Sequence, residues 1–223
     1  GMMESGQWEE ARLWLSGESA TGVDAMVAMT MHVIRYDDGS EGLPQEQIDQ
    51  CIVDLNSEVE LTGLLFFQEG PTIYHDDSDL AESVYEDFCT IVNTGVVANT
   101  VNCYFIPVYE GLCGVASYPS SGCQGVTVAN GCAATDWNHS TFTHEVGHNL
   151  GAAHDADNSA VDDGLYLYSH GQHFDGGTPD SHRTIMAYQK NFNTQVNFFS
   201  NPNVSQLGSP TGNAEGTANP ADN

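Results

Sequence analysis

Basic side chains are almost absent from this sequence. Its 223 residues include 31 acidic residues but only four basic ones, namely Arg12, Arg35, Arg183 and Lys190. A formal net charge of −27 argues against a nucleic acid or an anionic membrane surface as a partner, because both would repel the protein. Such a charge is typical of a solvated acidic surface in salt, and calcium binding is a second interpretation compatible with the first.

Long apolar runs are missing too. No stretch reaches the roughly 20 apolar residues of a membrane-spanning helix, so we expect no membrane insertion. The first residues show no signal peptide, and Gly1 before Met2 resembles the remnant of a cleaved tag. We expect that an export signal or pro-segment has been removed, and that the protein is a monomer.

Closely spaced cysteine pairs are also lacking. The six cysteines form no CxxC pair, which argues against a structural zinc site. Their even number favours three disulfides and therefore secretion into an oxidising compartment. Pairing of Cys51 with Cys89 and of Cys113 with Cys123 is compatible with the elements described below, and buried free thiols are the alternative.

Strand and helix patterns alternate in the first half of the chain. Residues 23–35 place apolar side chains at every second position, which predicts a strand. Further strands are predicted at 64–67 and 101–109, with amphipathic helices between the three strands at 44–59 and 78–92. This β-α-β-α-β order favours a largely parallel sheet with helices packed on it.

Residues 111–132 differ from what precedes them, because they are rich in glycine and cysteine. They contain two short apolar runs, at 113–118 and 125–129, which we interpret as two further strands, one of them at the sheet edge. Residues 155–185 are rich in Asp, Gly, Ser and His and show little periodicity. They indicate an irregular second part of the fold.

Residues 142–155 read FTHEVGHNLGAAHD and contain three histidines. In a helix, His148 lies one turn after His144 and is rotated from it by about 40°, so that the two imidazoles share a face. Glu145 lies at the edge of that face, whereas Val146 points to the opposite side, which can be buried. The exposed face can therefore present two nitrogen atoms to a metal ion.

His154 cannot reach the same ion from the same helix, because ten helical residues rise about 15 Å. The helix has to end, and Gly151 stands where a left-handed C-cap is needed. The pattern HExxHxxGxxH therefore predicts a helix, a sharp turn and a third ligand, with a fourth zinc position left for water. We expect His144, His148 and His154 to bind zinc; the alternative is a polar helix with two surface histidines.

These residues resemble the metzincins, a clan of zinc endopeptidases. Residues 184–188, which read TIMAY, resemble the Met-turn of the clan, whose methionine, here Met186, lies beneath the metal. Asp155 after the third histidine is similar to the reprolysin (adamalysin) branch, and residues 199–202 resemble bacterial members of that branch. Tyr188 departs from typical adamalysins and is similar to the switchable zinc ligand of astacins and serralysins.

The resemblance implies a secreted zinc-dependent endopeptidase that hydrolyses protein or peptide substrates. Glu145 would be the general base that takes a proton from the attacking water, and Tyr188 would stabilise the oxygen of the scissile carbonyl. Substrate is expected to pair with the edge strand near residues 113–118. A specificity pocket is expected from Phe192, Val196 and Phe198. The alternatives are a zinc hydrolase acting on cell-wall peptide or another amide, and a non-catalytic adhesion module.

The resemblance and the element order together predict an α/β (α+β) fold of the metzincin type. It would contain a mixed, mostly parallel five-stranded sheet with helices, an active-site helix and a small irregular C-terminal subdomain. We expect an N-terminal segment (1–22), a catalytic domain (23–203) and a tail or linker (204–223). The upper subdomain of the catalytic domain would end near residue 151, and the lower one would cover about 152–203.

Overall fold

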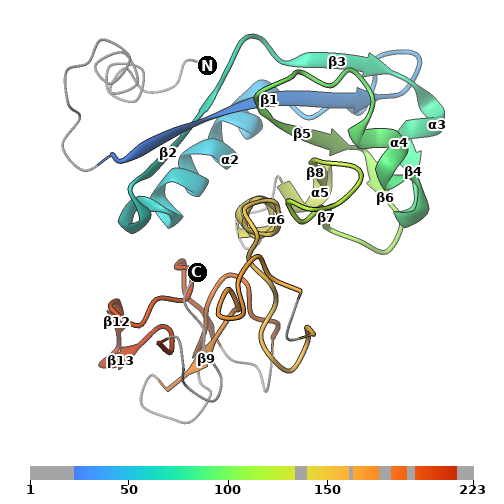
Figure 1. Ribbon diagram of the computed structural model, residues 1–223. Helices are drawn as coiled ribbons and strands as arrows, with labels where there is room; N and C mark the ends of the chain where they lie inside the picture. Colours follow the sequence, from blue (N-terminus) through green and yellow to red (C-terminus); the bar gives the residue numbers. More distant parts are fainter. Residues whose placement is uncertain (1–22, 134–139, 161–162, 176–181, 190–193, 215–223) are drawn as a thin grey trace. The chain divides into compact units, whose positions relative to one another are not determined.

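The computed structural model of the protein describes residues 23–133, 140–160, 163–175, 182–189 and 194–214 (Figure 1). The N-terminal segment expected at residues 1–22 lies outside this part of the chain. In the described residues no helix is long and apolar enough to cross a membrane.

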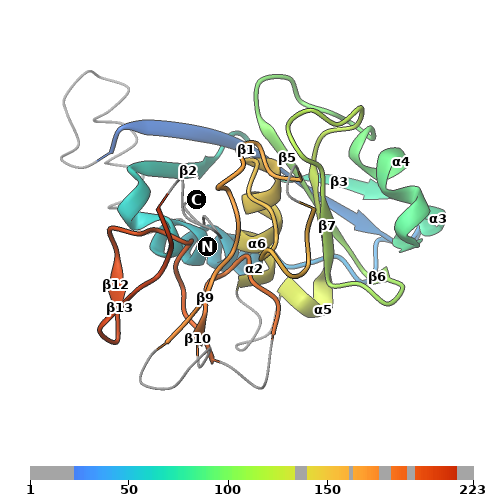
Figure 2. The ribbon, with the colours of Figure 1, turned by 60° about the horizontal axis from the view of Figure 1, so that its bottom comes forward.

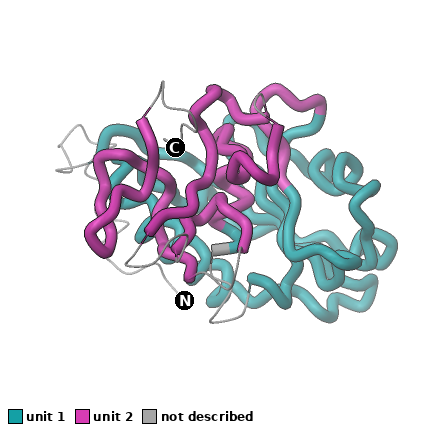
Figure 3. The backbone as a smooth tube through the Cα atoms, turned by 90° about the horizontal axis from the view of Figure 1, so that it is seen from below, with its two compact units in different colours: residues 1–115, 123–142 teal, residues 116–122, 143–223 magenta. Residues whose placement is uncertain are grey.

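The chain divides into two compact units (Figure 3). Unit 1 comprises residues 1–115 and 123–142, and unit 2 comprises residues 116–122 and 143–223. The histidine motif and residues 184–188 both belong to unit 2, whereas the predicted strands and helices that precede them belong mainly to unit 1. The domain boundaries inferred from the sequence stay predictions.

A mostly parallel sheet forms the frame of unit 1. Its strands follow the order β2-β1-β5-β8-β7, and β3 also pairs with β1 (Figure 1, Figure 2). The strands of this sheet are β1 (Ala25–Arg35), β2 (Leu64–Gln68), β3 (Ile73–Asp76), β5 (Val101–Ile106), β7 (Gly114–Ala116) and β8 (Val126–Ala129). The pairs β1–β2, β1–β3, β1–β5 and β5–β8 are parallel. The mostly parallel α/β fold predicted from the sequence is confirmed.

The sheet has six strands rather than the predicted five, because two of them share one side of β1. β2 pairs with β1 from Ala25 to Met29, and β3 pairs with it from His32 to Arg35. Pro71, which lies between the two short strands, has no backbone N–H to donate to a sheet ladder. The sheet is therefore five strands wide, although it contains six.

β7 is the edge strand, as predicted, and it runs antiparallel to β8. The N–H of Ala129 donates to the carbonyl of Cys113 at 2.9 Å, and Thr127 Oγ1 donates to the carbonyl of Val115 at 2.9 Å. Residue numbers fall along one strand as they rise along the other, which is the antiparallel pattern. The mixed sheet expected from the sequence follows from this one strand.

β1 is an inner strand of the sheet, and both of its faces are buried. Met29, Met31 and Val33 are fully buried on one face, and His32 and Ile34 are fully buried on the other. A strand that is covered on both sides is nearly continuously apolar. The period-two pattern in the sequence therefore described only one of its two buried faces.

Helix α2 (Gln45–Glu58) lies where the sequence predicted a helix, and the one-turn 3-10 helix η1 (Glu60–Thr62) follows it. The buried side chains of α2 are Ile48, Cys51, Ile52, Leu55 and Glu58. Asn56 attaches the helix to β2, because its Nδ2 donates to the carbonyl of Phe66 at 2.9 Å and its Oδ1 accepts from the N–H of Phe66 at 2.8 Å.

The prediction of one continuous helix at 78–92 is wrong. The structure has four short elements there: α3 (Ser78–Ala81), β4 (Glu82–Ser83), the 3-10 helix η2 (Tyr85–Asp87) and α4 (Phe88–Val92). β4 pairs in parallel with β6 (Val108–Tyr109), and this pairing draws the chain out of the helix. The apolar stripe remains in one core, because Ala81, Ile91 and Val92 belong to the same buried cluster as Tyr104 of β5.

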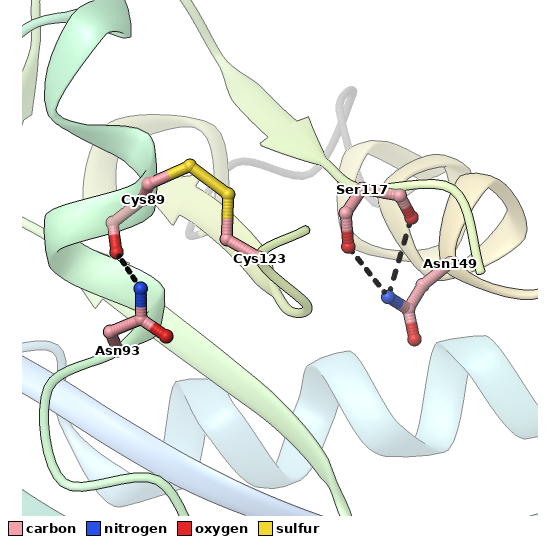
Figure 4. Close-up of a disulfide and its surroundings, with 5 residues drawn as sticks. All are labelled: Cys89, Asn93, Ser117, Cys123 and Asn149. Atoms are coloured by element: carbon pink, nitrogen blue, oxygen red, sulfur yellow. Dashed lines mark hydrogen bonds between the residues drawn. A yellow bond between two sulfur atoms is a disulfide. The ribbon is translucent and has the colours of Figure 1, made fainter. Parts of the chain in front are cut away.

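Two disulfides lie in unit 1, not the predicted three. Cys89 is bonded to Cys123 (Figure 4), and Cys113 is bonded to Cys132 of helix α5 (Asn130–Ala133). The remaining two cysteines, Cys51 and Cys103, are buried free thiols. The predicted pairs Cys51–Cys89 and Cys113–Cys123 are both wrong.

Cys51 and Cys89 cannot bond because they lie on opposite faces of the sheet. Cys89 belongs to α4, which packs on the face that carries Tyr104. Cys103 precedes Tyr104 in β5 and so points to the other face. The thiol of Cys51 lies within electrostatic range of Cys103, which places α2 on that second face.

Apart from helix α6 (Ser140–Asn149), which begins in unit 1, the described elements of unit 2 are short. Its two-residue strands are β9 (His173–Phe174), β10 (His182–Arg183), β11 (Thr194–Gln195), β12 (Ser205–Gln206) and β13 (Ser209–Pro210). β10 pairs with β9 antiparallel and with β11 parallel, and β12 pairs antiparallel with β13. This irregular structure agrees with the low periodicity of its sequence.

Candidate metal centre

Helix α6 carries the first two histidines of the motif. The ring centroids of His144 and His148 are 4.7 Å apart, as expected for residues one turn apart on the same face. Val146, on the opposite side of the helix, is fully buried. Within the described residues the helix runs from Ser140 to Asn149.

The helix ends at the predicted glycine in a Schellman motif. Gly151 has a φ of +103°, a conformation that favours glycine. Its N–H donates to the carbonyl of His148 at 2.9 Å, and the N–H of Ala152 donates to the carbonyl of Gly147 at 2.9 Å. A Cβ atom at position 151 would also collide with Leu165. This turn reverses the chain and allows His154 to approach the helix.

The three histidines converge on one point. His154 Nε2 lies 3.2 Å from Nε2 of His144 and 3.0 Å from Nε2 of His148. Across the described ranges, these residues form the one group of three or more His, Cys, Asp or Glu side chains that could hold a metal ion. A tetrahedral ion with Zn–N bonds of 2.0–2.1 Å would hold its ligand nitrogens about 3.3 Å apart. The observed spacing is close to this value.

Hydrogen bonds on the far sides of the rings decide which nitrogens face the centre. His144 Nδ1 lies 2.9 Å from the carbonyl oxygen of Ile185, and His148 Nδ1 lies 2.8 Å from that of Ala152. A carbonyl only accepts, so each Nδ1 carries the proton and each Nε2 presents a lone pair. Lone pairs that point at one place repel each other unless a cation lies between them. The donor set therefore fits a zinc ion, and carbonyls that back its histidines are typical of metal sites.

Burial keeps these imidazoles in the form that binds metal. It lowers the pKa of His144 to about 4 and that of His148 to about 3, with smaller effects from neighbouring groups. The pKa of His154 is lowered as well, again mainly by burial. The neutral ring, which has a free nitrogen lone pair, is the metal-ligating form.

Glu145 lies beside this cluster and is 7% exposed. Burial raises the pKa of its carboxyl to about 8, and a bound cation would oppose this effect. The carboxylate contributes to raising the pKa of both Tyr118 and Tyr188, so both phenols lie within its electrostatic range. A carboxylate and two phenols thus accompany the three histidines.

Met186 packs directly against helix α6. The residue is fully buried, in a cluster with Ala152, Ile185 and Phe199. A Cβ atom at Gly147 would lie 2.6 Å from the sulfur of Met186 and 2.8 Å from the ring of Phe199. The helix can therefore rest on the methionine only because residue 147 has no side chain.

Asp155 connects the third histidine to the segment after Met186. Its Oδ2 accepts from the backbone N–H of Tyr188 at 2.9 Å, and both of its oxygens accept from Asn158 Nδ2. The carboxylate is 3% exposed. These bonds use its oxygens within the protein and fix the position of residue 188 relative to residue 154.

The ring of Tyr188 lies over the ring of His154, with 4.1 Å between their centroids. The side chain is 47% exposed, and its backbone carbonyl lies 2.8 Å from Nε2 of His173. Burial first, and then Glu145 and Asp155, raise the pKa of the phenol, which stays protonated at neutral pH. Tyr188 is therefore an accessible hydrogen-bond donor beside the cluster.

The contacts that two further residues make with the cluster could not be predicted from the sequence. The ring of Tyr118 packs edge-on against that of His148, with 5.4 Å between the ring centroids. His170 Nδ1 lies 2.9 Å from the carbonyl oxygen of His154. Asn149 Nδ2 donates to Ser117 Oγ at 3.2 Å and so ties the segment of Tyr118 to the end of α6 (Figure 4). No periodicity or motif marks these residues, because only the tertiary fold brings them to the helix.

The predicted specificity pocket is described only in part. Phe192 lies outside the described residues. The carbonyl of Phe198 accepts from the N–H of Ile185 at 3.1 Å, and the N–H of Val196 donates to the carbonyl of Arg183 at 2.8 Å. These bonds hold residues 196–198 next to the segment of Met186, and the pocket itself stays a prediction.

Comparison with known families places the chain among metallopeptidases. A reprolysin-type family model, described as metallo-peptidase family M12, matches residues 87–200, about half of the chain. The matched range contains the three histidines, Glu145 and the segment around Met186. The chain belongs to metallo-peptidase family M12. The resemblance inferred from the motif is thus confirmed.

Two bacterial relatives are similar to about half of this family M12 chain. The peptidyl-Asp metalloendopeptidase of Stenotrophomonas maltophilia is 39% identical over 108 residues, which cover 46% of this chain and 24% of the relative. The protein of the same name from Xanthomonas campestris pv. campestris is 38% identical over 107 residues, which cover 46% and 23%. The match thus spans about a quarter of the length of these curated relatives.

Solved structures resemble this family M12 chain at low sequence identity. A chain described as "Structure of a chaperone-substrate complex" matches with a TM-score of 0.60 and 16% identity, over 85% of this chain and 31% of that one. Mature mirolysin of Tannerella forsythia, in complex with a cleaved peptide, matches with a TM-score of 0.49 and 16% identity, over 65% and 69%. The first likeness shows a shared fold and nothing about activity.

Proposed function

We propose that this chain is the catalytic part of a zinc-dependent endopeptidase. The proposal rests on the convergence of the Nε2 atoms of His144, His148 and His154, two of which are fixed as lone-pair donors by their Nδ1 contacts. Membership of a metallopeptidase family supports the same function. When bound, zinc would polarise the scissile carbonyl and increase the acidity of a water molecule.

Glu145 would act as the general base. It follows His144 on the same helix and lies within electrostatic range of Tyr118 and Tyr188. Its carboxylate would accept a proton from the attacking water as the water oxygen adds to the carbonyl carbon. The same proton would pass to the leaving amine when the C–N bond breaks, which returns Glu145 to its starting state.

Tyr188 would stabilise the charge that develops on the carbonyl oxygen. Its ring lies against His154, and its exposed side chain can donate a hydrogen bond into the space next to the histidines. Donors aimed at a developing oxyanion are among the strongest contributors to acyl-transfer catalysis. Asp155 and His173 would hold the backbone of residue 188 in place through the contacts already described.

We further propose that the substrate has aspartate at the cleaved bond and that the protein acts outside the cell. The first proposal is supported by the name of the relatives, peptidyl-Asp metalloendopeptidase. The second is supported by the two disulfides, which form in oxidising compartments. Calcium binding, which was inferred from the acidic composition, stays a prediction. In the described ranges no second group of three or more metal-binding side chains supports it.

Digestion of unfolded casein tests the proposed function. We expect cleavage by the zinc-loaded protein, loss of cleavage after chelation and recovery when zinc is returned. Mass spectrometry of the products would identify the cut sites. Cleavage that a chelator leaves unchanged would contradict the role of the metal, and no cleavage at full zinc occupancy would contradict the proposed activity.

A further inference from the structure

Arg183 is a cation in an otherwise acidic protein. The sequence has four basic residues against 31 acidic ones, and Arg183 is the one Lys or Arg among the described residues of unit 2. It lies at the end of β10, three residues before Met186. A positive charge has therefore been placed in the segment that contacts the metal-binding helix.

The guanidinium group is poorly satisfied within the protein. Its Nη1 donates to the carbonyl of Ala187 at 2.7 Å, whereas its Nε is buried and has no partner among the described residues. Where the chain is described, the one ion pair of an Arg with a carboxylate is Arg35 with Asp76. Asp155 lies within electrostatic range of Arg183, but the oxygens of Asp155 already accept other hydrogen bonds.

The partly buried guanidinium has hydrogen-bonding capacity left for a ligand. Burial lowers the pKa of Arg183, which reflects the cost of removing its charge from water. The planar fork of an arginine matches the two oxygens of a carboxylate, and a partly buried pair of this kind is favourable only when both partners are present. An acid-rich chain could readily supply such a carboxylate, yet the described residues do not.

The guanidinium lies beside the proposed catalytic centre. Ala187, which accepts its hydrogen bond, directly precedes Tyr188, whose ring lies 4.1 Å from that of His154. The charge of Arg183 also contributes to lowering the pKa of His144. Arg183 is therefore within electrostatic range of His144. It also holds the carbonyl of the residue that precedes Tyr188, whose ring covers His154.

We propose that Arg183 recognises the side-chain carboxylate of an aspartate at the scissile bond of the substrate. This inference rests on the proposed endopeptidase function and assigns its acidic preference to one residue. A net charge of −27 disfavours acidic peptides, and a cation close to the scissile bond would offset this repulsion locally. Asparagine has nearly the same shape but no charge, and it would leave the guanidinium without an anion.

Paired peptides that differ only in Asp or Asn at the cleaved bond test this assignment. We expect the wild-type protein to prefer Asp in kcat/KM, and Arg183→Gln to reduce the Asp-to-Asn ratio by roughly 100-fold, as for loss of one partner of a buried charge pair. Arg183→Lys keeps the charge without the fork and should retain part of the preference. It also serves as the second variant if Arg183→Gln does not fold.

Two other variants are controls for charge. Arg35→Gln removes one positive charge from the exposed pair with Asp76 in unit 1 and should leave the ratio unchanged. Lys190→Gln tests the other basic residue of unit 2, which lies outside the described residues, and should also leave it unchanged. Loss of the preference in Lys190→Gln instead of Arg183→Gln would overturn the assignment.

The outcomes separate this inference from the proposed function. An equal fall of kcat/KM for both peptides in Arg183→Gln would show that Arg183 only braces the carbonyl of Ala187, and would overturn the inference. Cleavage by the wild type without preference for Asp would overturn it too, while the endopeptidase function would stand. Failure of the zinc-loaded wild type to cleave any peptide would overturn both.

Discussion

At the residue scale, hydrogen bonds between side chains and backbone groups fix the geometry of the candidate metal centre. The carbonyls of Ile185 and Ala152 orient His144 and His148, and Asp155 holds the N–H of Tyr188. Tyr118 and Tyr188 both lie within electrostatic range of Glu145, but only Tyr188 packs on a ring of the third histidine. We therefore assign the hydrogen bond to the carbonyl oxygen to Tyr188.

Tyr188→Phe should retain zinc and lower kcat by about 10²-fold to 10³-fold, the range typical of removing one oxyanion donor. KM should change much less, because the donor acts as charge develops in the transition state. Tyr166→Phe is the matched control, since Tyr166 is an exposed tyrosine of unit 2 that stacks on Tyr168. Steady-state kinetics and zinc content measure both effects; an unchanged kcat would leave Tyr188 with a packing role only.

The three histidines could be predicted from the sequence because their spacing is set by local geometry. A helical turn determines the distance between His144 and His148, and a left-handed glycine determines where the chain reverses before His154. Gly147 and Tyr118 could not be identified in this way. The need for glycine at 147 comes from Met186, which is 39 positions later in the sequence, and only the folded chain brings them together.

At the element scale, the sheet and its disulfides hold the edge strand β7 in unit 1. Cys113, directly before β7, is bonded to Cys132 of α5, and Cys123 is bonded to Cys89 of α4. Cys51 and Cys103 remain free and buried. Burial raises the pKa of Cys51 to about 12 and that of Cys103 still further, so both thiols stay protonated and unreactive in the folded protein.

Alkylation without a reducing agent checks this pairing. The native protein should take up no alkyl group, and the protein unfolded in denaturant should take up two, at Cys51 and Cys103. Prior reduction should increase the number to six, which is the total cysteine count. Intact mass and peptide mapping give the result. A protein that takes up no alkyl group even when unfolded would have a third disulfide, as the sequence originally suggested.

The elements themselves could be predicted where one periodicity continued over many residues. α2 and β1 have long, regular patterns, and both lie where these patterns indicated. The region 78–92 has an equally good helical stripe, but the pairing of β4 with β6 interrupts it. Such pairing depends on residues about 25 positions apart in the sequence. The local pattern therefore predicted correctly which side chains are buried, but it predicted the wrong backbone conformation.

At the scale of the whole molecule, the buried His32 and its half-buried partner His75 link stability to pH. His32 is fully buried and stacks on Tyr104; its Nε2 lies 3.0 Å from Oδ1 of Asn102, and its Nδ1 lies 3.0 Å from Nε2 of His75. Asn102 Oδ1 also accepts from the N–H of Val97, so His32 Nε2 carries a proton and its Nδ1 accepts from His75. This pattern requires His32 to be neutral.

Stability should therefore fall when the solution becomes acidic. Burial lowers the pKa of His32 to about 4 and also lowers that of His75, whereas both titrate near 6.5 in an unfolded chain. The unfolded chain binds protons first, so stability is complete above about pH 6.5 and decreases as pH falls towards 4. For His32 the loss is about 3 kcal/mol.

Urea unfolding at a series of pH values measures this slope. His75→Gln keeps a donor for His32 but removes one titrating group, so its stability should depend less steeply on pH than that of the wild type. Comparison of the two proteins cancels the contribution of the metal-binding histidines. Equal slopes in both proteins would show that His75 does not contribute to acid sensitivity.

We propose that three histidines bind zinc and that Glu145 acts with the metal in peptide hydrolysis. Glu145→Gln has nearly the same size but cannot accept the proton of the attacking water. We measure bound zinc and peptide cleavage on the same sample of this variant. We expect one zinc ion per chain and almost complete loss of cleavage. Full cleavage by a zinc-loaded Glu145→Gln protein, or loss of zinc together with activity, would contradict the proposal.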